Sequence, residues 1–102
     1  MEQPQSYGLS FAIVDGRSCV RGDCDLRTAA DLERWLATFE GGPLRVDVSD
    51  VTFFDSTALR VFLNARRRNP HMRLVNPSTA VARVLEITGT AEYLVDGHDN
   101  TA

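Results

Sequence analysis

Apolar and polar residues alternate in several stretches of the chain, and this spacing predicts β-strands. The first stretch, residues 9–13, is followed by Asp15-Gly16, a dipeptide typical of two-residue hairpin turns, and then by a second stretch at 17–22. These two strands should therefore pair antiparallel. Further stretches at 44–48 and 72–75 predict two more strands.

Three segments instead repeat their apolar residues at helical spacing. The first helix is predicted from Thr28, with Asp31 as its capping-box partner, and its apolar stripe places Trp35 in the core. The second begins near Ser56 and stops at Asn69-Pro70, with three arginines in its last turn. The third is capped by Ser78 and ends at Gly89. Residues 93–95 suggest a short terminal strand or a docking segment.

The order of these elements predicts an α/β fold. After the hairpin, strands and helices alternate, so the later strands should be joined by helical crossovers and run parallel. The strand at 44–48 has one polar face, which indicates a sheet covered on one side only. We therefore expect one domain at residues 8–96, a mixed four- to five-stranded sheet with helices mainly on one face, a flexible leader at 1–7 and a flexible tail at 97–102.

Composition narrows the class of protein. The 102 residues carry 14 acidic and 11 basic side chains, a net charge of -3, which argues against a nucleic-acid binder. No apolar run is long enough to span a membrane, and the first residues lack a signal-peptide core, so a cytoplasmic location is expected. Cys19 and Cys24 are five residues apart in a strand, should face opposite sides, and are not expected to form a disulfide.

The sequence contains few of the residue patterns that enzymes use for catalysis. His71 lies in a turn and His98 in the predicted tail, so no histidine is placed to activate a serine. Zinc-ligand spacing and Gly-rich phosphate loops are missing from the sequence. Five aspartates could gather near one sheet edge and hold a divalent cation, although a solvated acidic rim is the favoured interpretation. They are Asp23, Asp25, Asp47, Asp50 and Asp55.

Ser56 is the most informative single residue. It lies where a buried strand passes through a short polar loop into the second predicted helix. Local physics leaves two interpretations open: an ordinary N-cap hydroxyl, or a regulatory site whose modification changes the charge at a helix N-terminus.

Four segments together resemble the STAS domain family, which includes the bacterial anti-sigma-factor antagonists. Gly22-Asp23-Cys24-Asp25 with Thr28-Ala29 resembles the Gly-Glu-Leu-Asp…Thr-Ala motif, with Asp23-Cys24 in place of Glu-Leu. Phe53-Phe54-Asp55-Ser56-Thr57-Ala58-Leu59 resembles the phosphorylation loop, with Ala58 where glycine is common. The segments 74–78 and 81–89 resemble the last strand and helix. The resemblance spans about residues 8 to 96.

The resemblance implies a function without catalysis or a cofactor. An unphosphorylated antagonist binds an anti-sigma factor that is also a serine kinase, and the sigma factor is released. The kinase then phosphorylates the loop serine, here Ser56, and a phosphatase resets the switch. ATP belongs to the partner. The resemblance implies a partner-binding surface formed by Asp23, Asp25, Asp55, Ser56, Thr57 and Arg60.

Two alternatives stay open at this point. One is a STAS interaction subunit of another signalling scaffold, and the other is a small enzyme or nucleotide binder that uses the acidic rim. Thr57 is a second possible phosphate acceptor. The polar residues of the 44–48 strand do not form the apolar patch of an obligate dimer, so a monomer is expected.

Overall fold

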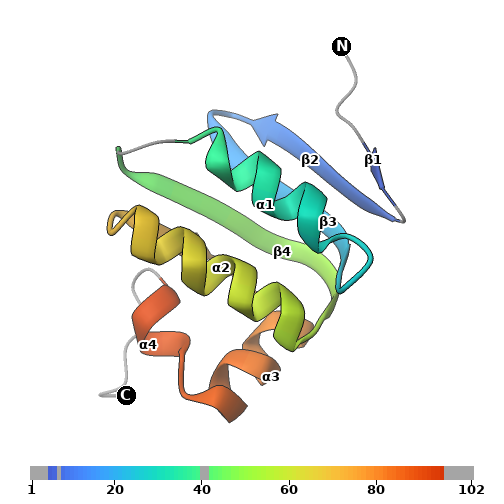
Figure 1. The fold of residues 1–102 in the computed structure, drawn as a ribbon, viewed down its shortest axis with the longest axis vertical. Helices are drawn as coiled ribbons and strands as arrows, with labels where there is room; N and C mark the ends of the chain where they lie inside the picture. Colours follow the sequence, from blue (N-terminus) through green and yellow to red (C-terminus); the bar gives the residue numbers. More distant parts are fainter. Residues whose placement is uncertain (1–4, 7, 40–41, 96–102) are drawn as a thin grey trace.

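The computed structural model describes residues 5–6, 8–39 and 42–95. Within them, one five-stranded sheet has the order β1-β2-β3-β4-β5, and four helices join or follow its strands (Figure 1). The elements are β1 (Gln5–Ser6), β2 (Leu9–Val14), β3 (Arg17–Cys24), α1 (Ala29–Ala37), β4 (Leu44–Phe54), α2 (Ser56–Arg68), β5 (Met72–Val75), α3 (Thr79–Thr88) and α4 (Ala91–Leu94).

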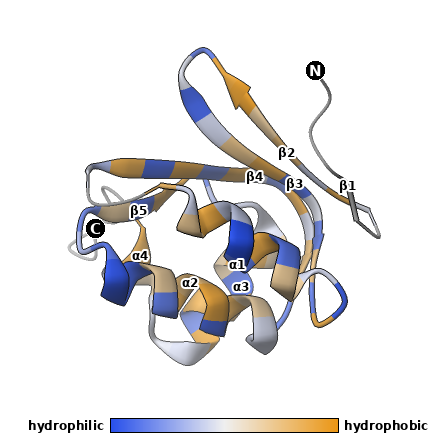
Figure 2. Ribbon diagram, turned by 45° about the horizontal axis from the view of Figure 1, so that its top comes forward, coloured by the Kyte–Doolittle hydropathy of each residue, from blue (hydrophilic) through white to orange (hydrophobic). Residues whose placement is uncertain are grey.

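The sheet is mixed, as predicted. β1, β2 and β3 pair antiparallel, whereas β3, β4 and β5 run parallel. Asp15 and Gly16 both have positive φ (52° and 77°), the backbone that the predicted two-residue turn requires. The helices lie on one side of the sheet, which confirms the predicted architecture (Figure 2).

Several details differ from the sequence predictions. Gln5–Ser6 belong to the predicted flexible leader but form β1, which pairs with β2; the rest of the leader and the 97–102 tail lie outside the described residues. Residues 91–94 form the helical turn α4 rather than a strand, although Val95 makes a parallel bridge with Leu74. Trp35 lies half-buried at the rim of the core, where it stacks on Phe11 with ring centroids 4.7 Å apart.

β4 extends to Phe54, beyond the predicted 44–48 strand, and its register with β3 shifts twice along the way. Each shift adds a residue to β4, so its buried positions change from every second residue to Val48, Val51 and Phe54. Strict alternation would bury positions 50 and 52, which are exposed. The shifts therefore decide which side chains reach the surface at the C-terminal end of β4.

Asp47 is the central polar group on the sheet face opposite the helices. Its carboxylate accepts hydrogen bonds from the Ser49 hydroxyl (2.6 Å) and the Asn76 amide (3.1 Å) and pairs with Arg17 (3.3 Å). Burial opposes ionisation of this carboxyl, but the hydrogen bonds from Ser49, Asn76 and Arg17 outweigh it and hold its pKa below the usual value.

Asp47→Asn should therefore lower the free energy of unfolding at neutral pH by about 1–2 kcal/mol, since it removes the charge that these donors stabilise. A carboxyl whose pKa is lower in the folded state stabilises the fold above its unfolded pKa of about 3.9 and loses that contribution as the pH falls. Urea unfolding should thus show a large wild-type advantage at pH 7 and a small one near pH 3. Asp50→Asn is the control, because Asp50 is largely exposed and should change little at either pH. An advantage that does not shrink in acid would contradict the assignment.

Candidate functional site

The C-terminal ends of β3 and β4 meet at one edge of the sheet, because the two strands are parallel. Cys24 lies beside Phe54 in the register, and the Asp55 amide donates to the Cys24 carbonyl oxygen at 3.3 Å. This backbone bond joins the loop that follows β3 to the start of α2. The segments that carried the STAS resemblance, around Asp23 and around Ser56, are therefore neighbours.

Ser56 is the first residue of α2, and the N-cap is Asp55. Asp55 is extended (φ −126°, ψ −175°), and its Oδ1 accepts a hydrogen bond from the Ala58 amide at 3.0 Å. The interpretation of Ser56 as the N-cap is therefore wrong. The Ser56 side chain is exposed, Thr57 is half-buried, and within the described residues the Ser56 hydroxyl has no hydrogen-bond partner. The capping function and the exposed hydroxyl belong to two adjacent residues.

The loop between β3 and α1 carries both signs of charge. Arg27 pairs with the carboxylates of Asp25 (2.9 Å) and Asp23 (3.7 Å), and Asp23 also accepts from the Thr52 hydroxyl at 3.0 Å. The hydrogen bond from the Arg27 side chain holds the pKa of Asp25 below its usual value. The predicted acidic rim is thus a mixed-charge rim. Asp47 and Asp50 are placed further back along β4.

Thr28 shapes this loop from inside. It is fully buried, and its hydroxyl donates to the Asp23 carbonyl oxygen (2.9 Å) and accepts from the Asp25 amide (3.0 Å). It makes no side-chain cap on α1, and Asp31 pairs with Arg34 instead, so the predicted capping box is wrong. Thr28 fixes the loop that presents Asp23, Asp25 and Arg27.

Two large apolar side chains at this edge were missed by the sequence reasoning. Leu26 is 76% exposed in the β3–α1 loop, and Phe53 is 50% exposed at the end of β4. Phe53 points outward because of the second register shift, which periodicity does not reveal. Leu26 has a sequence signal: it is an apolar residue between two charged loop residues, outside any apolar stripe. Exposed apolar groups within a polar rim are typical of a protein-binding surface.

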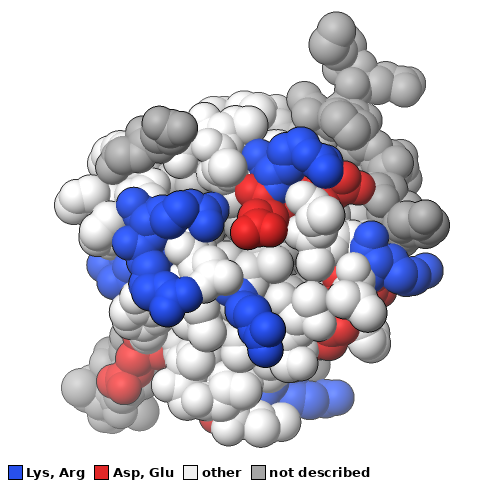
Figure 3. Space-filling model, viewed as in Figure 1, with Lys and Arg blue, Asp and Glu red and all other residues white. Residues whose placement is uncertain are grey.

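Arg60 lies one helical turn beyond Ser56 on α2 and is exposed. The other basic residues of this helix, Arg66, Arg67 and Arg68, occupy its last turn, and Figure 3 shows basic atoms gathered over that end. Arg66 lies over the Tyr93 ring at 4.3 Å, so it attaches α4 to α2. Ser56 is therefore at the opposite end of α2 from the arginine run, whereas Arg60 lies between them and lines one hollow together with Arg67.

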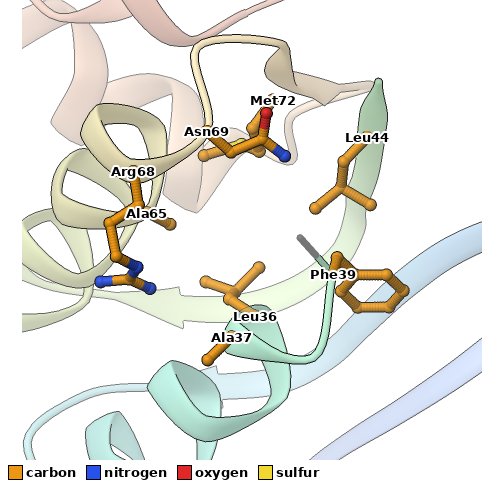
Figure 4. Close-up of a pocket in the computed structure, with 8 residues that line it drawn as sticks. All are labelled: Leu36, Ala37, Phe39, Leu44, Ala65, Arg68, Asn69 and Met72. Atoms are coloured by element: carbon orange, nitrogen blue, oxygen red, sulfur yellow. The ribbon is translucent and has the colours of Figure 1, made fainter. Parts of the chain in front are cut away.

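One hollow in the described part of the structure lies away from Ser56. It measures about 630 Å³ and opens between the C-terminal ends of α1 and α2 and the start of β4 (Figure 4). None of the described side chains that line it can act as a general base or a nucleophile. They are Leu36, Ala37, Phe39, Leu44, Ala65, Arg68, Asn69 and Met72.

The described residues near the site do not form a metal-ligand group, and the Cys24 thiol is not ionised. Among the described residues, no three aspartate, glutamate, histidine or cysteine side chains group as metal ligands. Burial raises the pKa of Cys24 to about 12, so its thiol stays protonated at neutral pH. Cys19 and Cys24 are both free. The helices of the described part are too short or too polar to cross a membrane.

The comparisons with known proteins agree with this geometry. Residues 15–96 match the family described as Mlab, STAS domain. The anti-sigma-B factor antagonist of Listeria monocytogenes is 34% identical over 82 residues, which cover 74% of this chain and 72% of that protein. The antagonist of the same name from Bacillus subtilis is 28% identical over 81 residues, covering 74% of each protein.

Solved structures share the fold. An anti-sigma factor antagonist from Mycobacterium paratuberculosis superposes with a TM-score of 0.71 at 24% identity, covering 92% of this chain and 87% of that one. The anti-sigma factor antagonist SpoIIAA in its unphosphorylated form superposes with a TM-score of 0.60 at 17% identity, covering 91% and 90%. The chain therefore belongs to the STAS domain family, the family of the anti-sigma-factor antagonists to which it is similar.

Proposed function

We propose that this protein is an anti-sigma-factor antagonist that binds an anti-sigma factor and is switched off by phosphorylation of Ser56. The observation that carries the proposal is the exposed Ser56 hydroxyl at the first position of α2, next to a separate cap. A kinase can reach this oxygen without displacing a structural hydrogen bond. The names of the curated relatives support an anti-sigma factor as the partner.

The surface around Ser56 suits a protein partner. Leu26 and Phe53 offer apolar area, while Asp23, Asp25 and Arg27 surround it with paired charges. An apolar centre with a polar rim is the usual composition of a specific interface. The proposed contact surface therefore comprises Asp23, Asp25, Asp55, Ser56, Thr57 and Arg60, to which the fold adds Leu26 and Phe53.

Phosphorylation would make this surface repel its partner. The Ser56 Oγ attacks the γ-phosphorus of ATP held by the partner kinase, ADP leaves with the electron pair of the broken P–O bond, and the hydroxyl proton passes to the kinase. The product gains about -1.5 to -2 charges at neutral pH. Because helix N-termini stabilise negative charge, the domain keeps its fold. The added negative charge on the binding surface repels the partner. A phosphatase reverses the step, and the antagonist acts as a cytoplasmic monomer.

The decisive test is to incubate the protein with its kinase-type anti-sigma factor and ATP and to map the phosphate by mass spectrometry. We expect one phosphate on Ser56, none in Ser56→Ala, and unchanged labelling in Thr57→Val. Labelling that survives in Ser56→Ala and disappears in Thr57→Val would transfer the role to Thr57. An unlabelled wild-type protein would contradict the proposed switch.

The second candidate is a STAS interaction subunit of another signalling assembly. The observation that favours it is the family match itself, whose description is not limited to antagonists. A pull-down that recovers a kinase-type anti-sigma factor would support the first proposal. A pull-down that recovers a different, non-kinase complex through the Ser56 surface would support the second.

A further inference from the structure

Arg60 is placed to reach back over Ser56. Residues four apart on a helix lie on one face with Cβ atoms about 6 Å apart, and long side chains on a helix point toward its N-terminus. Ser56 and Arg60 have this spacing on α2, and both side chains are exposed. The Arg60 guanidinium can therefore cover the Ser56 hydroxyl without any change in backbone.

Arg60 is also available for a new partner, unlike Arg27. Arg27 already pairs with Asp23 and Asp25. Arg60 has no carboxylate partner within the part of the chain that the structure describes. The three arginines of the last turn of α2 begin ten residues beyond Ser56, about 15 Å along the helix axis. Arg60 is thus a cation on the same helix that is available to an anion on Ser56.

We propose that Arg60 is the internal counter-ion of the Ser56 phosphate, an inference that rests on the proposed phosphorylation of Ser56. Arg presents several N–H donors in a planar fork that matches phosphate oxygens, and such charge-assisted hydrogen bonds are among the stronger ones. The pair closes across one turn of α2. It stabilises the helix in the phosphorylated state.

The pairing gives phosphorylation a second effect on the partner surface. Before modification, the Arg60 side chain is open to a carboxylate of the anti-sigma factor. After modification, it turns toward the phosphate and is withdrawn from the interface. The partner therefore meets an added negative charge and also loses a cation.

The experiment uses the full chain with phosphoserine incorporated at position 56 during synthesis, so it does not depend on a kinase. The variants are Arg60→Gln, Arg60→Lys and the control Arg67→Gln, which removes the same charge from the same helix about three turns beyond Ser56. Phosphorus NMR then follows the second pKa of the phosphate, which is about 6 in the absence of a partner. The charged groups on neighbouring elements include Asp55, the Asp23, Asp25 and Arg27 cluster, and Arg83 and Glu86 of α3, and these are identical in all variants.

We expect the phosphate pKa to be about 0.2–0.4 unit lower in the wild-type protein than in Arg60→Gln. Arg67→Gln should match the wild type, and Arg60→Lys should fall between them, since an ammonium supplies charge without the fork. Phosphorylation should also raise the thermal midpoint more in the wild type than in Arg60→Gln. Equal pKa values in the wild type and Arg60→Gln would overturn the inference, even if a kinase modifies Ser56. A kinase that ignores Ser56 would overturn the proposed function while the pairing could still be measured.

Discussion

Gly22→Ala is expected to destabilise the domain by roughly 3–5 kcal/mol, a large part of the total stability of a small protein. Gly22 lies in β3 between β2 and β4, paired with Leu9 and Val51. A methyl group there would stand 1.7 Å from the Gly8 carbonyl oxygen, which is backbone and cannot rotate away. Gly22 also has φ +102°, which L side chains rarely adopt. Steric overlap and backbone strain therefore both contribute to the loss of stability in Gly22→Ala.

Two further glycines separate these contributions. Gly16 has positive φ but open space around it, so Gly16→Ala should cost only the strain, about 1 kcal/mol. Gly42 has open space around it and a φ outside the left-handed region, so Gly42→Ala should be close to neutral. Urea unfolding should rank the three variants in that order. If Gly22→Ala were no worse than Gly16→Ala, the β1–β2 turn would have to move freely, and the proposed close approach would not restrict this position.

The Gly22 result also explains a motif that was recognised only by resemblance. The Gly22-Asp23-Cys24-Asp25 segment signals the family, but the sequence does not say why its first residue is glycine. The reason is a contact with Gly8, fourteen residues earlier, across a hairpin. Contacts of this kind have no local pattern in the sequence.

Much of the fold could be predicted because its signals are local. The Asp15-Gly16 turn, the Ser78 cap and the Gly89 stop each depend on the conformational preference of one or two residues, and all three are observed. The failed prediction of a capping box involves a side chain that has two possible sets of hydrogen-bond partners. The Thr28 hydroxyl could cap α1 or bond to the β3–α1 loop. It forms hydrogen bonds with the backbone of that loop and does not cap the helix.

The candidate site was located by the sequence but not described in detail. The Ser56 position followed from the strand-to-helix junction and the resemblance. The assignment of the cap to Asp55 needed the backbone geometry, because both residues have side-chain oxygens able to cap. The pairing of Arg27 with Asp23 and Asp25 depends on loop closure, and the exposure of Phe53 depends on register shifts in β4. Neither loop closure nor a register shift can be read from the periodicity of apolar residues in the sequence.

Ser56→Asp should weaken binding of the anti-sigma factor by at least about a hundredfold, because like-charge placement at an interface can cost several kcal/mol and each 1.4 kcal/mol is tenfold. Ser56→Ala should bind within a few-fold of the wild type, since the exposed hydroxyl has no structural partner to lose within the described residues. Titration calorimetry of each variant against the same partner measures the difference.

Ser56→Asn is the matched control, because asparagine has nearly the size and shape of aspartate without its charge. If the switch is electrostatic, Ser56→Asn should bind far more tightly than Ser56→Asp, and raised salt should narrow the gap between them. The unfolding midpoint of Ser56→Asp should equal or exceed that of the wild type, since a negative charge in the first turn favours α2 by about 0.3–1 kcal/mol. Equal loss of binding in both variants would mean that the partner requires a small side chain at this position. The signal would then be steric, and the counter-ion role of Arg60 would have no bearing on release of the partner.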